Sequence, residues 1–337
     1  MTNLHISQHA LEQWLYQMVN SKIEVFAPVH DGEKTDFRLL AFGDKVADDY
    51  VQTTQSAKRF AFPKAEKLFS YRKEGKDVTL QERNLNDFPE IVLWKVRPCD
   101  AAGFAPLTGI FNWDYKDNIY NARRDKITLV SFSCTRCDEY CFCTSVHGGP
   151  GNTEGSDIQV TELPDRSALV EILTPKGKSL IERFVQETTP ADGIDKETYL
   201  ASVPVRFKLE QLREKLEGAF DSPIWKQQSE RCLGCGACAF VCPTCACFDI
   251  QEDARGSSGS WIRCWDSCGF SLFTQHTSGH NPRPTQSTRW RQRILHKFSY
   301  MPDRIDETGC TGCGRCSRAC PVDMNIVEHL MSIENHG

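Results

Sequence analysis

Short apolar runs and amphipathic segments alternate along the first two thirds of the chain. One helical face is formed by five apolar side chains at 3.6-residue spacing: Leu11, Trp14, Leu15, Met18 and Val19. The segment 22–42 has the pattern of a strand, an Asp-Gly turn and a second strand. Apolar runs of strand length follow at 91–96 and 126–133, and the polar stretch 112–125 between them predicts a crossover helix.

The same pattern continues to about residue 205 and then changes. Segments 157–163 and 168–174 predict a β-hairpin, and 176–185 predicts a helix. We therefore expect an α/β domain, a sheet with flanking helices, over residues 1–205. Residues 206–337 show few strand signals and predict a mainly helical domain, with a flexible loop at 255–260.

A helix rich in basic residues is predicted near residue 290. Trp290, Ile294 and Phe298 share one of its faces. Four basic side chains surround that face: Arg289, Arg291, Arg293 and Lys297. The sequence favours either a docking face for an acidic partner or an ordinary solvated face.

Composition and charge exclude some classes of function. The formal charge is −5, so nucleic acid is not an expected partner. The chain contains no run of 18 apolar residues, so we expect no membrane-spanning helix. The first residues lack the basic and apolar regions of a secretory signal, which predicts a cytoplasmic protein.

Seventeen cysteines in 337 residues are the strongest chemical signal in the sequence. Eight of them form two runs of the pattern C-x2-C-x2-C-x3-C-P, which is the bacterial ferredoxin spacing. The first run is Cys232, Cys235, Cys238 and Cys242, and the second is Cys310, Cys313, Cys316 and Cys320. A lone C-x2-C pair would fit zinc equally well, but two complete runs favour two [4Fe-4S] clusters.

The fourth cysteine of such a run ligates the other cluster in two-cluster proteins. We therefore predict that the first cluster is held by Cys232, Cys235, Cys238 and Cys320. The second cluster is predicted to be held by Cys310, Cys313, Cys316 and Cys242.

Nine cysteines lie outside this assignment. Cys134, Cys141 and Cys143 follow one predicted strand closely, and Cys99 follows its predicted neighbour. Parallel neighbouring strands would bring these four thiols together at the strand ends, as a candidate third cluster. Cys245, Cys247 and Cys268 are competing candidates for the ligands of a third cluster. A redox-active disulfide, a substrate-reactive thiol and inert buried thiols are the other interpretations.

The chain resembles the beta, iron–sulfur subunit of cytoplasmic [NiFe] sulfhydrogenases, and it is also similar to the A subunit of anaerobic sulfite reductase. The resemblance covers most of the chain. It is carried in order by "FAPV" (26–29), "RPCD" (97–100), "EYCFC" (139–143), "CLGCGACAFVCPTCACFD" (232–249), "WDSC" (265–268), "GHNPRP" (279–284) and "CTGCGRCSRACP" (310–321). Seven surplus cysteines fall on family motifs, whereas Cys137 and Cys264 do not.

The resemblance implies a non-catalytic electron-transfer subunit, with no catalytic residues of its own. It would lie between a flavoprotein subunit that binds FAD and NAD(P) and a catalytic subunit of hydrogenase or, alternatively, sulfite reductase type. Two rival hypotheses stay open on the sequence: a subunit that itself reduces a sulfur substrate at the surplus cysteines, and a redox sensor. No dinucleotide-binding glycine motif or catalytic triad is recognisable.

Overall fold

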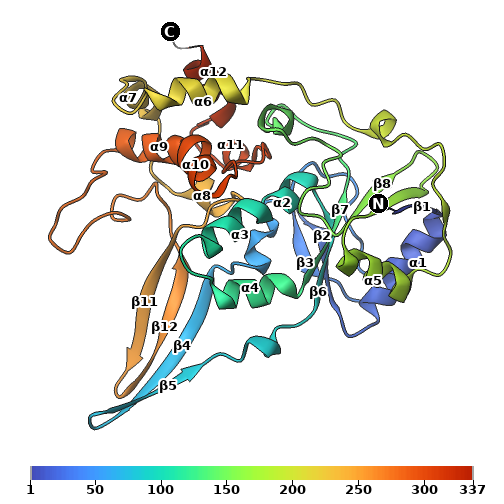
Figure 1. Ribbon diagram of the computed structural model, residues 1–337, viewed down its shortest axis with the longest axis horizontal. Coiled ribbons are helices and arrows are strands. Elements are labelled where there is room, and N and C mark those ends of the chain that lie inside the picture. The colour runs from blue at the N-terminus through green and yellow to red at the C-terminus, as the bar shows by residue number, and fades with distance from the viewer. Residues whose placement is uncertain (1, 336–337) are drawn as a thin grey trace.

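The computed structural model describes residues 2–335 (Figure 1). Its larger sheet has eight strands in the order β10-β1-β9-β8-β7-β6-β2-β3. These strands are β1 (Thr2–Ile6), β2 (Glu24–Asp31), β3 (Lys34–Leu39), β6 (Ile91–Val96), β7 (Ile127–Phe132), β8 (Ile158–Glu162), β9 (Ala168–Ile172) and β10 (Thr189–Pro190). The four central strands β2, β6, β7 and β8 run parallel, and antiparallel strands flank them on both sides.

Helices cover both faces of this sheet, as a largely parallel sheet requires (Figure 1). They are α1 (Gln8–Val19), α2 (Pro98–Ala102), α3 (Phe104–Asn112), α4 (Asn118–Asp125) and α5 (Pro175–Phe184). β6 is buried along its whole length. Its alternate side chains face opposite ways: Trp94 packs in the core that includes Trp14 of α1, and Leu93 packs in the core that includes Leu107 of α3.

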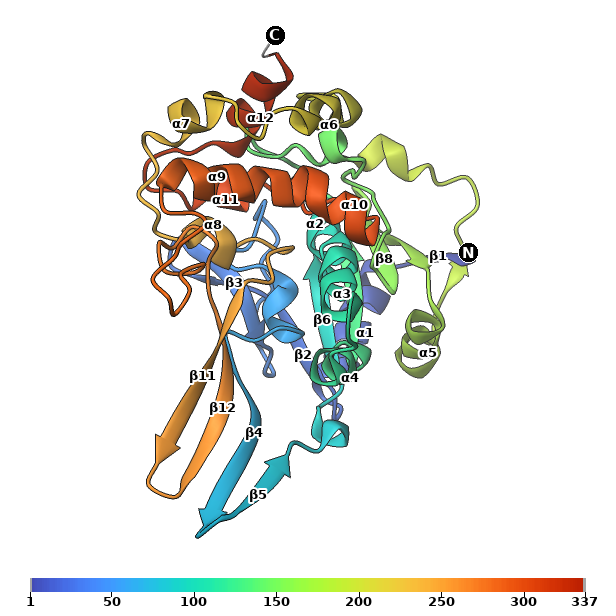
Figure 2. The ribbon, with the colours of Figure 1, turned by 60° about the vertical axis from the view of Figure 1, so that its left-hand side comes forward.

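A helical layer lies above the carboxyl ends of the parallel strands (Figures 1 and 2). It contains α6 (Leu209–Glu217), α7 (Ile224–Ser229), α8 (Ala237–Phe240), α9 (Gln286–Leu295), α10 (Met301–Ile305), α11 (Arg315–Arg318) and α12 (Ile326–Glu334). Between α9 and α10 lies a π-helical turn, η5 (His296–Tyr300). The predicted α/β domain followed by a helical cysteine-rich region is thus confirmed.

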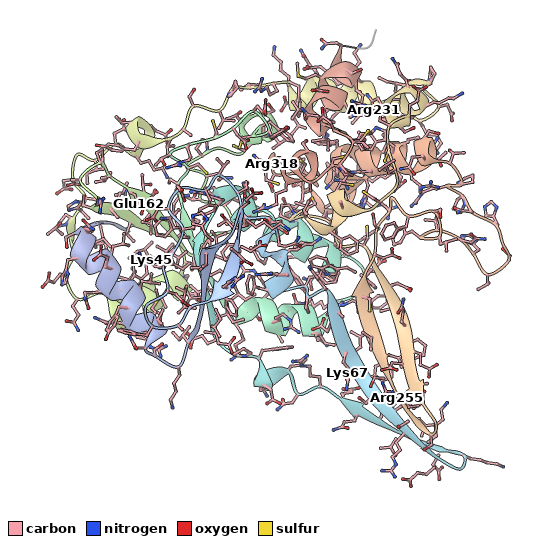
Figure 3. The ribbon with its side chains drawn as sticks, turned by 180° about the vertical axis from the view of Figure 1, so that it is seen from behind. Lys45, Lys67, Glu162, Arg231, Arg255 and Arg318 are labelled. Carbon is pink, nitrogen blue, oxygen red and sulfur yellow. The ribbon has the colours of Figure 1, made fainter. Side chains whose placement is uncertain are left out.

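A second sheet, which we call the arm, projects from the body (Figure 2). Its strand order is β11-β12-β4-β5. The strands are β4 (Ala65–Glu74), β5 (Asp77–Glu82), β11 (Phe248–Arg255) and β12 (Ser258–Trp265). Figure 3 shows Lys67 and Arg255 on the arm.

The sequence did not predict the arm. The expected loop 255–260 is mostly strand, because β12 begins at Ser258. β12 pairs with β4, so this sheet joins segments from both sides of residue 205. Within residues 2–335, no helix is long and apolar enough to span a membrane.

Candidate metal centres

The two ferredoxin runs fold into loops of the same shape. In each run the second glycine adopts the left-handed conformation, with φ of 74° at Gly236 and 71° at Gly314. A one-turn helix starts directly after each of them, α8 in the first run and α11 in the second. Glycine is required there because a side chain disfavours positive φ, so the local sequence determines this loop geometry.

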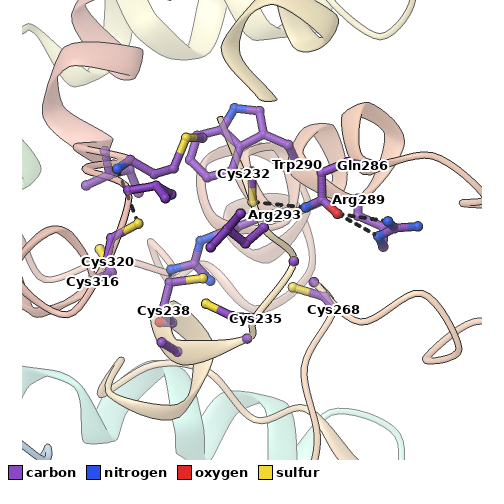
Figure 4. Close-up of a pocket in the computed structure, with 18 residues that line it drawn as sticks. Cys232, Cys235, Cys238, Cys268, Gln286, Arg289, Trp290, Arg293, Cys316 and Cys320 are labelled. Carbon is purple, nitrogen blue, oxygen red and sulfur yellow. Dashed lines mark hydrogen bonds between the residues drawn. The ribbon is translucent and has the colours of Figure 1, made fainter. Parts of the chain in front are cut away.

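The first centre is the set Cys232, Cys235, Cys238 and Cys320, and all four line one enclosed pocket (Figure 4). Two N–H groups are directed at its sulfur atoms. Gln286 Nε2 donates to Cys232 Sγ at 3.0 Å, and the backbone N–H of Met324 donates to Cys320 Sγ at 3.3 Å. The last cysteine of the second run thus lies in the same pocket as the first three cysteines of the first run, and Cys268 and Cys316 line that pocket as well.

The second centre is the set Cys242, Cys310, Cys313 and Cys316. Burial raises the pKa of Cys310 to about 12. The charge of Lys297 lowers this pKa in part, and the Cys242 thiolate raises it. The pKa of Cys316 is also raised to about 12, mainly by burial and in part by Cys242. Cys242 lies close to the second run, although it belongs in sequence to the first, because Lys297 Nζ contacts both Cys242 Sγ and the carbonyl of Gly309, the residue before Cys310.

Buried cations surround the two centres. Lys297 Nζ donates to Cys242 Sγ at 3.3 Å and to the Gly309 carbonyl at 2.6 Å. Arg293 donates through Nη2 to the Cys238 carbonyl at 3.2 Å, and its Nη1 lies 3.7 Å from Cys245 Sγ. Burial disfavours the Lys297 charge, but the thiolates of Cys242 and Cys245 outweigh it and raise its pKa.

These contacts contradict the expected role of the basic helix. Arg293 and Lys297 are only 5% and 3% exposed, so they are neither solvated nor available for docking. Arg289 is also buried and donates to Gln286, the residue that contacts Cys232. Of the four basic side chains, Arg291 alone is not buried, and its guanidinium lies over the Phe220 ring and donates to the Phe220 carbonyl. The helical spacing of 286, 293 and 297 was the signal that could have grouped the three side chains that face cysteines.

A further pocket, which we call the strand-end pocket, is lined by Cys99, Cys134, Cys141 and Cys143. Cys99 follows β6 and Cys134 follows β7, and these strands are parallel neighbours. The expected juxtaposition at the strand ends is therefore present in the structure. Gln52 Nε2 donates to Cys99 Sγ at 2.8 Å. Cys137 also lines this pocket, although it falls on no family motif.

Two arginines beside the strand-end pocket are paired with carboxylates. Arg315 Nη1 donates to Asp100 Oδ1 at 2.8 Å, and both side chains are almost fully buried. Arg318 donates through Nε to Asp138 Oδ2 at 2.8 Å and through Nη2 to Cys141 Sγ at 3.4 Å. Figure 3 shows Arg318 at the junction of the sheet and the helical layer.

The strand-end pocket is in direct contact with the second centre. Cys313, a member of the second centre, lines the pocket together with Gly312. The Phe142 N–H donates to the Gly312 carbonyl at 2.9 Å. A Cβ atom at Gly312 would lie 2.4 Å from the Cys143 nitrogen, so only glycine allows this approach.

The three competing cysteines lie elsewhere, beside the first and second centres. Cys268 lines the pocket of the first centre, and the Sγ atom of Cys245 lies 3.7 Å from Nη1 of Arg293. The base of the β11–β12 hairpin brings them there, because the Asp266 N–H donates to the Cys247 carbonyl at 3.0 Å. Cys264 lies within β12, opposite Ala65 of β4.

The residues present fit thiolate-bound iron–sulfur clusters. All seventeen cysteines lie in the described range, and none of them forms a disulfide. Across residues 2–335, no three Cys, His, Asp or Glu side chains converge as the ligands of one metal ion do. Four irons in a cube need thiolates spread around them, in the company of N–H donors and positive charge, and both centres offer this.

Fold and site together define an iron–sulfur protein with two ferredoxin-type centres. In agreement, the family described as "4Fe-4S dicluster domain" matches residues 231–324. The chain is 31% identical over 314 residues to sulfhydrogenase 2 subunit beta of Pyrococcus furiosus, with 91% of each chain covered. It therefore belongs to the family of sulfhydrogenase beta subunits, and it is an iron–sulfur subunit of the electron-transfer kind.

A more distant similarity covers only part of the chain. The B chain of anaerobic dimethyl sulfoxide reductase from Haemophilus influenzae is 26% identical over 103 residues, which is 28% of this chain and 50% of that protein. No solved structure matches.

Proposed function

We propose that this chain relays electrons within a cytoplasmic, hydrogenase-type complex. Its partners would be a flavoprotein subunit that binds FAD and NAD(P) and a subunit that holds the catalytic metal. The 31% identity to a sulfhydrogenase beta subunit supports this assignment. On this proposal the chain itself is non-catalytic.

The observation that carries the proposal is an unbroken series of cysteine-lined sites. Cys313 of the second centre lines the strand-end pocket, and Cys316 of the second centre lines the pocket of the first. The second centre therefore lies between the other two sites. Such a series supports a relay in which electrons enter at one end of the series and leave at the other.

We assign the ligands of the two ferredoxin-type clusters as the sequence predicts them. Cys232, Cys235, Cys238 and Cys320 hold the first cluster, and Cys242, Cys310, Cys313 and Cys316 hold the second. Cys99, Cys134, Cys141 and Cys143 hold a third cluster in the strand-end pocket. Bound clusters supply reversible one-electron transfer.

The protein's own residues provide the surroundings of these clusters. Cys242 and Cys313 are buried, which limits the access of water to the second centre. Gln286 and Gln52 each direct an amide N–H at a cysteine sulfur, one at the first centre and one at the strand-end pocket. Such N–H···S bonds stabilise negative charge on sulfur and so adjust the potential of each site.

Iron and acid-labile sulfide counted on anaerobically purified chain test the cofactor part of this proposal. Three clusters require about twelve irons per chain, and two require about eight. Electron paramagnetic resonance (EPR) of the reduced protein checks that the iron is in cubes. A count of eight irons would contradict a cluster in the strand-end pocket. Bound zinc in place of iron would contradict the relay.

Purification of the tagged chain from its native host tests the partners. We expect a flavin-containing subunit and a hydrogenase-type subunit to elute with it. A chain that elutes alone, with its clusters intact, would contradict the complex and favour a sensor.

A further inference from the structure

One side of α9 and the following π-helical turn faces the cysteine sites. Gln286 contacts Cys232, Arg293 contacts the Cys238 carbonyl and Cys245, and Lys297 contacts Cys242. The steps between them are seven and four residues, so all three lie on one face of the helix. A single helix thus reaches from the first centre to the second.

Within residues 2–335, Arg293 and Lys297 are buried with no carboxylate to neutralise them. Their partners are carbonyls, the Thr244 hydroxyl and cysteine sulfur. Burying an unpaired charge is costly, so another negative charge must balance it. Among the described residues that these two side chains contact, the candidates are the cysteine thiolates.

Other buried cations of the described chain fall into both classes, since Lys58 and Arg97 donate to backbone carbonyls, whereas others have a carboxylate partner. Arg315 is also buried, at 2% exposed, and it is neutralised by Asp100. The chain therefore pairs a buried arginine with a carboxylate even within the second ferredoxin run, to which Arg315 belongs. It leaves Arg293 and Lys297 unpaired beside the ferredoxin-type centres.

We infer that Arg293 and Lys297 set the reduction potentials of the two ferredoxin-type centres, holding both above the values that neutral side chains would give. This inference rests on the proposed relay. A reduced cube carries one more negative charge than an oxidised cube, and a buried cation in a medium of low dielectric constant stabilises the more negative form.

The contacts divide this influence between the centres. Lys297 touches Cys242 and the Gly309 carbonyl next to Cys310, so it acts chiefly on the second centre. Arg293 lies between the centres: its Nη2 bonds the Cys238 carbonyl, and its charge also acts on the Cys316 thiolate. It therefore acts on both centres.

The test is a reductive titration of the full purified chain, followed by EPR at each potential. The variants are Lys297→Met and Arg293→Met, which keep most of the side-chain volume and remove the charge. Arg291→Met is the matched control, since Arg291 lies on the same helix but is not buried and lies over the Phe220 ring. A Cys235→Ser protein, altered at a first-centre ligand, identifies which signal belongs to which centre.

We expect Lys297→Met to lower the midpoint of the second centre and to change the first much less. Arg293→Met should lower both midpoints, and Arg291→Met should change neither. Lys297→Arg restores the charge and should return the second midpoint toward the starting value, which a purely structural role would not require.

The outcomes separate this inference from the proposed relay. If the wild-type protein contains no cubes, the proposed relay itself is contradicted. Intact cubes whose midpoints do not move in either charge-removing variant would overturn the inference alone. If Lys297→Met loses iron, the same titration is done on Lys297→Gln and Arg293→Gln. Each of these variants keeps an amide donor without the charge.

Discussion

The two ferredoxin-type centres and the strand-end pocket both gather cysteines, but they are built in different ways. The centres come from two short runs, each shaped by a left-handed glycine that precedes a one-turn helix. The strand-end pocket comes from segments that follow two parallel strands. The loops of the two centres are encoded by consecutive residues, whereas the strand-end pocket exists only once the sheet has formed.

The buried charges do not follow the same division. Arg293 and Lys297 stand unpaired beside the ferredoxin-type centres, within the described chain. Arg315 and Arg318 of the second ferredoxin run are held by Asp100 and Asp138. Arg97, which lies two residues before Cys99, is buried and donates to the Tyr50 and Val51 carbonyls. Buried cations without a carboxylate partner therefore occur in both regions, and the two ion pairs lie where the second centre meets the strand-end pocket.

Replacement of single cysteines should give the largest effect. Cys313→Ser should remove the second cluster, and Cys134→Ser should remove only the strand-end cluster, with about four irons lost per chain in each case. Cys264→Ser, outside all three sites, is the control and should keep its full iron content. Iron analysis measures this, and an unchanged iron count in Cys134→Ser would mean that the strand-end pocket holds no cluster.

Breaking the buried ion pair beside the strand-end pocket should come next. Arg315→Met leaves the Asp100 carboxylate buried without its partner, and this should lower the free energy of unfolding by about 3–5 kcal/mol. Chemical denaturation followed by circular dichroism measures the loss. The double variant Arg315→Met with Asp100→Asn should recover part of it. If the double variant is as unstable as the sum of both single ones, the two side chains are not coupled.

The contact between the second ferredoxin loop and the strand-end pocket can be tested through its glycine. Gly312→Ala adds a Cβ atom 2.4 Å from the Cys143 nitrogen at a φ of 65°. We expect a loss of about 2–4 kcal/mol from backbone strain and overpacking. Gly32→Ala is the matched control, because Gly32 has a φ of 60° with open space around it. Equal losses in both variants would show that the close approach is unimportant.

The smallest effect concerns acid stability of the helical layer. Burial, together with the charge of Arg231, lowers the pKa of His329 to about 4 from an ordinary 6.5. Its ring contacts Trp290 at 5.0 Å between centroids. Because the unfolded chain takes up this proton at a higher pH than the folded chain, stability is complete above pH 6.5 and falls as the pH drops toward 4.

The loss should be at most about 2 kcal/mol between about pH 7 and pH 5, because this interval covers only part of the distance between the two pKa values. Thermal melts of the wild type and of His329→Gln between about pH 7 and pH 5 measure it. The wild-type midpoint should fall faster with decreasing pH than that of the variant. Parallel lines for the two proteins would exclude His329 as the source.

Much of the α/β part was predictable because its strands are short and strongly apolar. β2, β3, β6 and β7 lie where the pattern predicts them, and so does the helix α1. The arm was missed because β11 and β5 are exposed along their whole length, so they have no buried face to produce an apolar alternation. The helix α3 was missed because nothing in the pattern separated it from its surroundings.

The sequence by itself determined the two ferredoxin loops, because cysteine spacing and left-handed glycines are properties of consecutive residues. It also indicated that Cys99 and Cys134 follow neighbouring strands. Only the tertiary structure decided that Arg293 and Lys297 turn inward to the cysteines instead of outward to water. The physical reason is that the direction of a helix face depends on what packs against it, and the thiolates that compensate these charges come from segments far away in the chain.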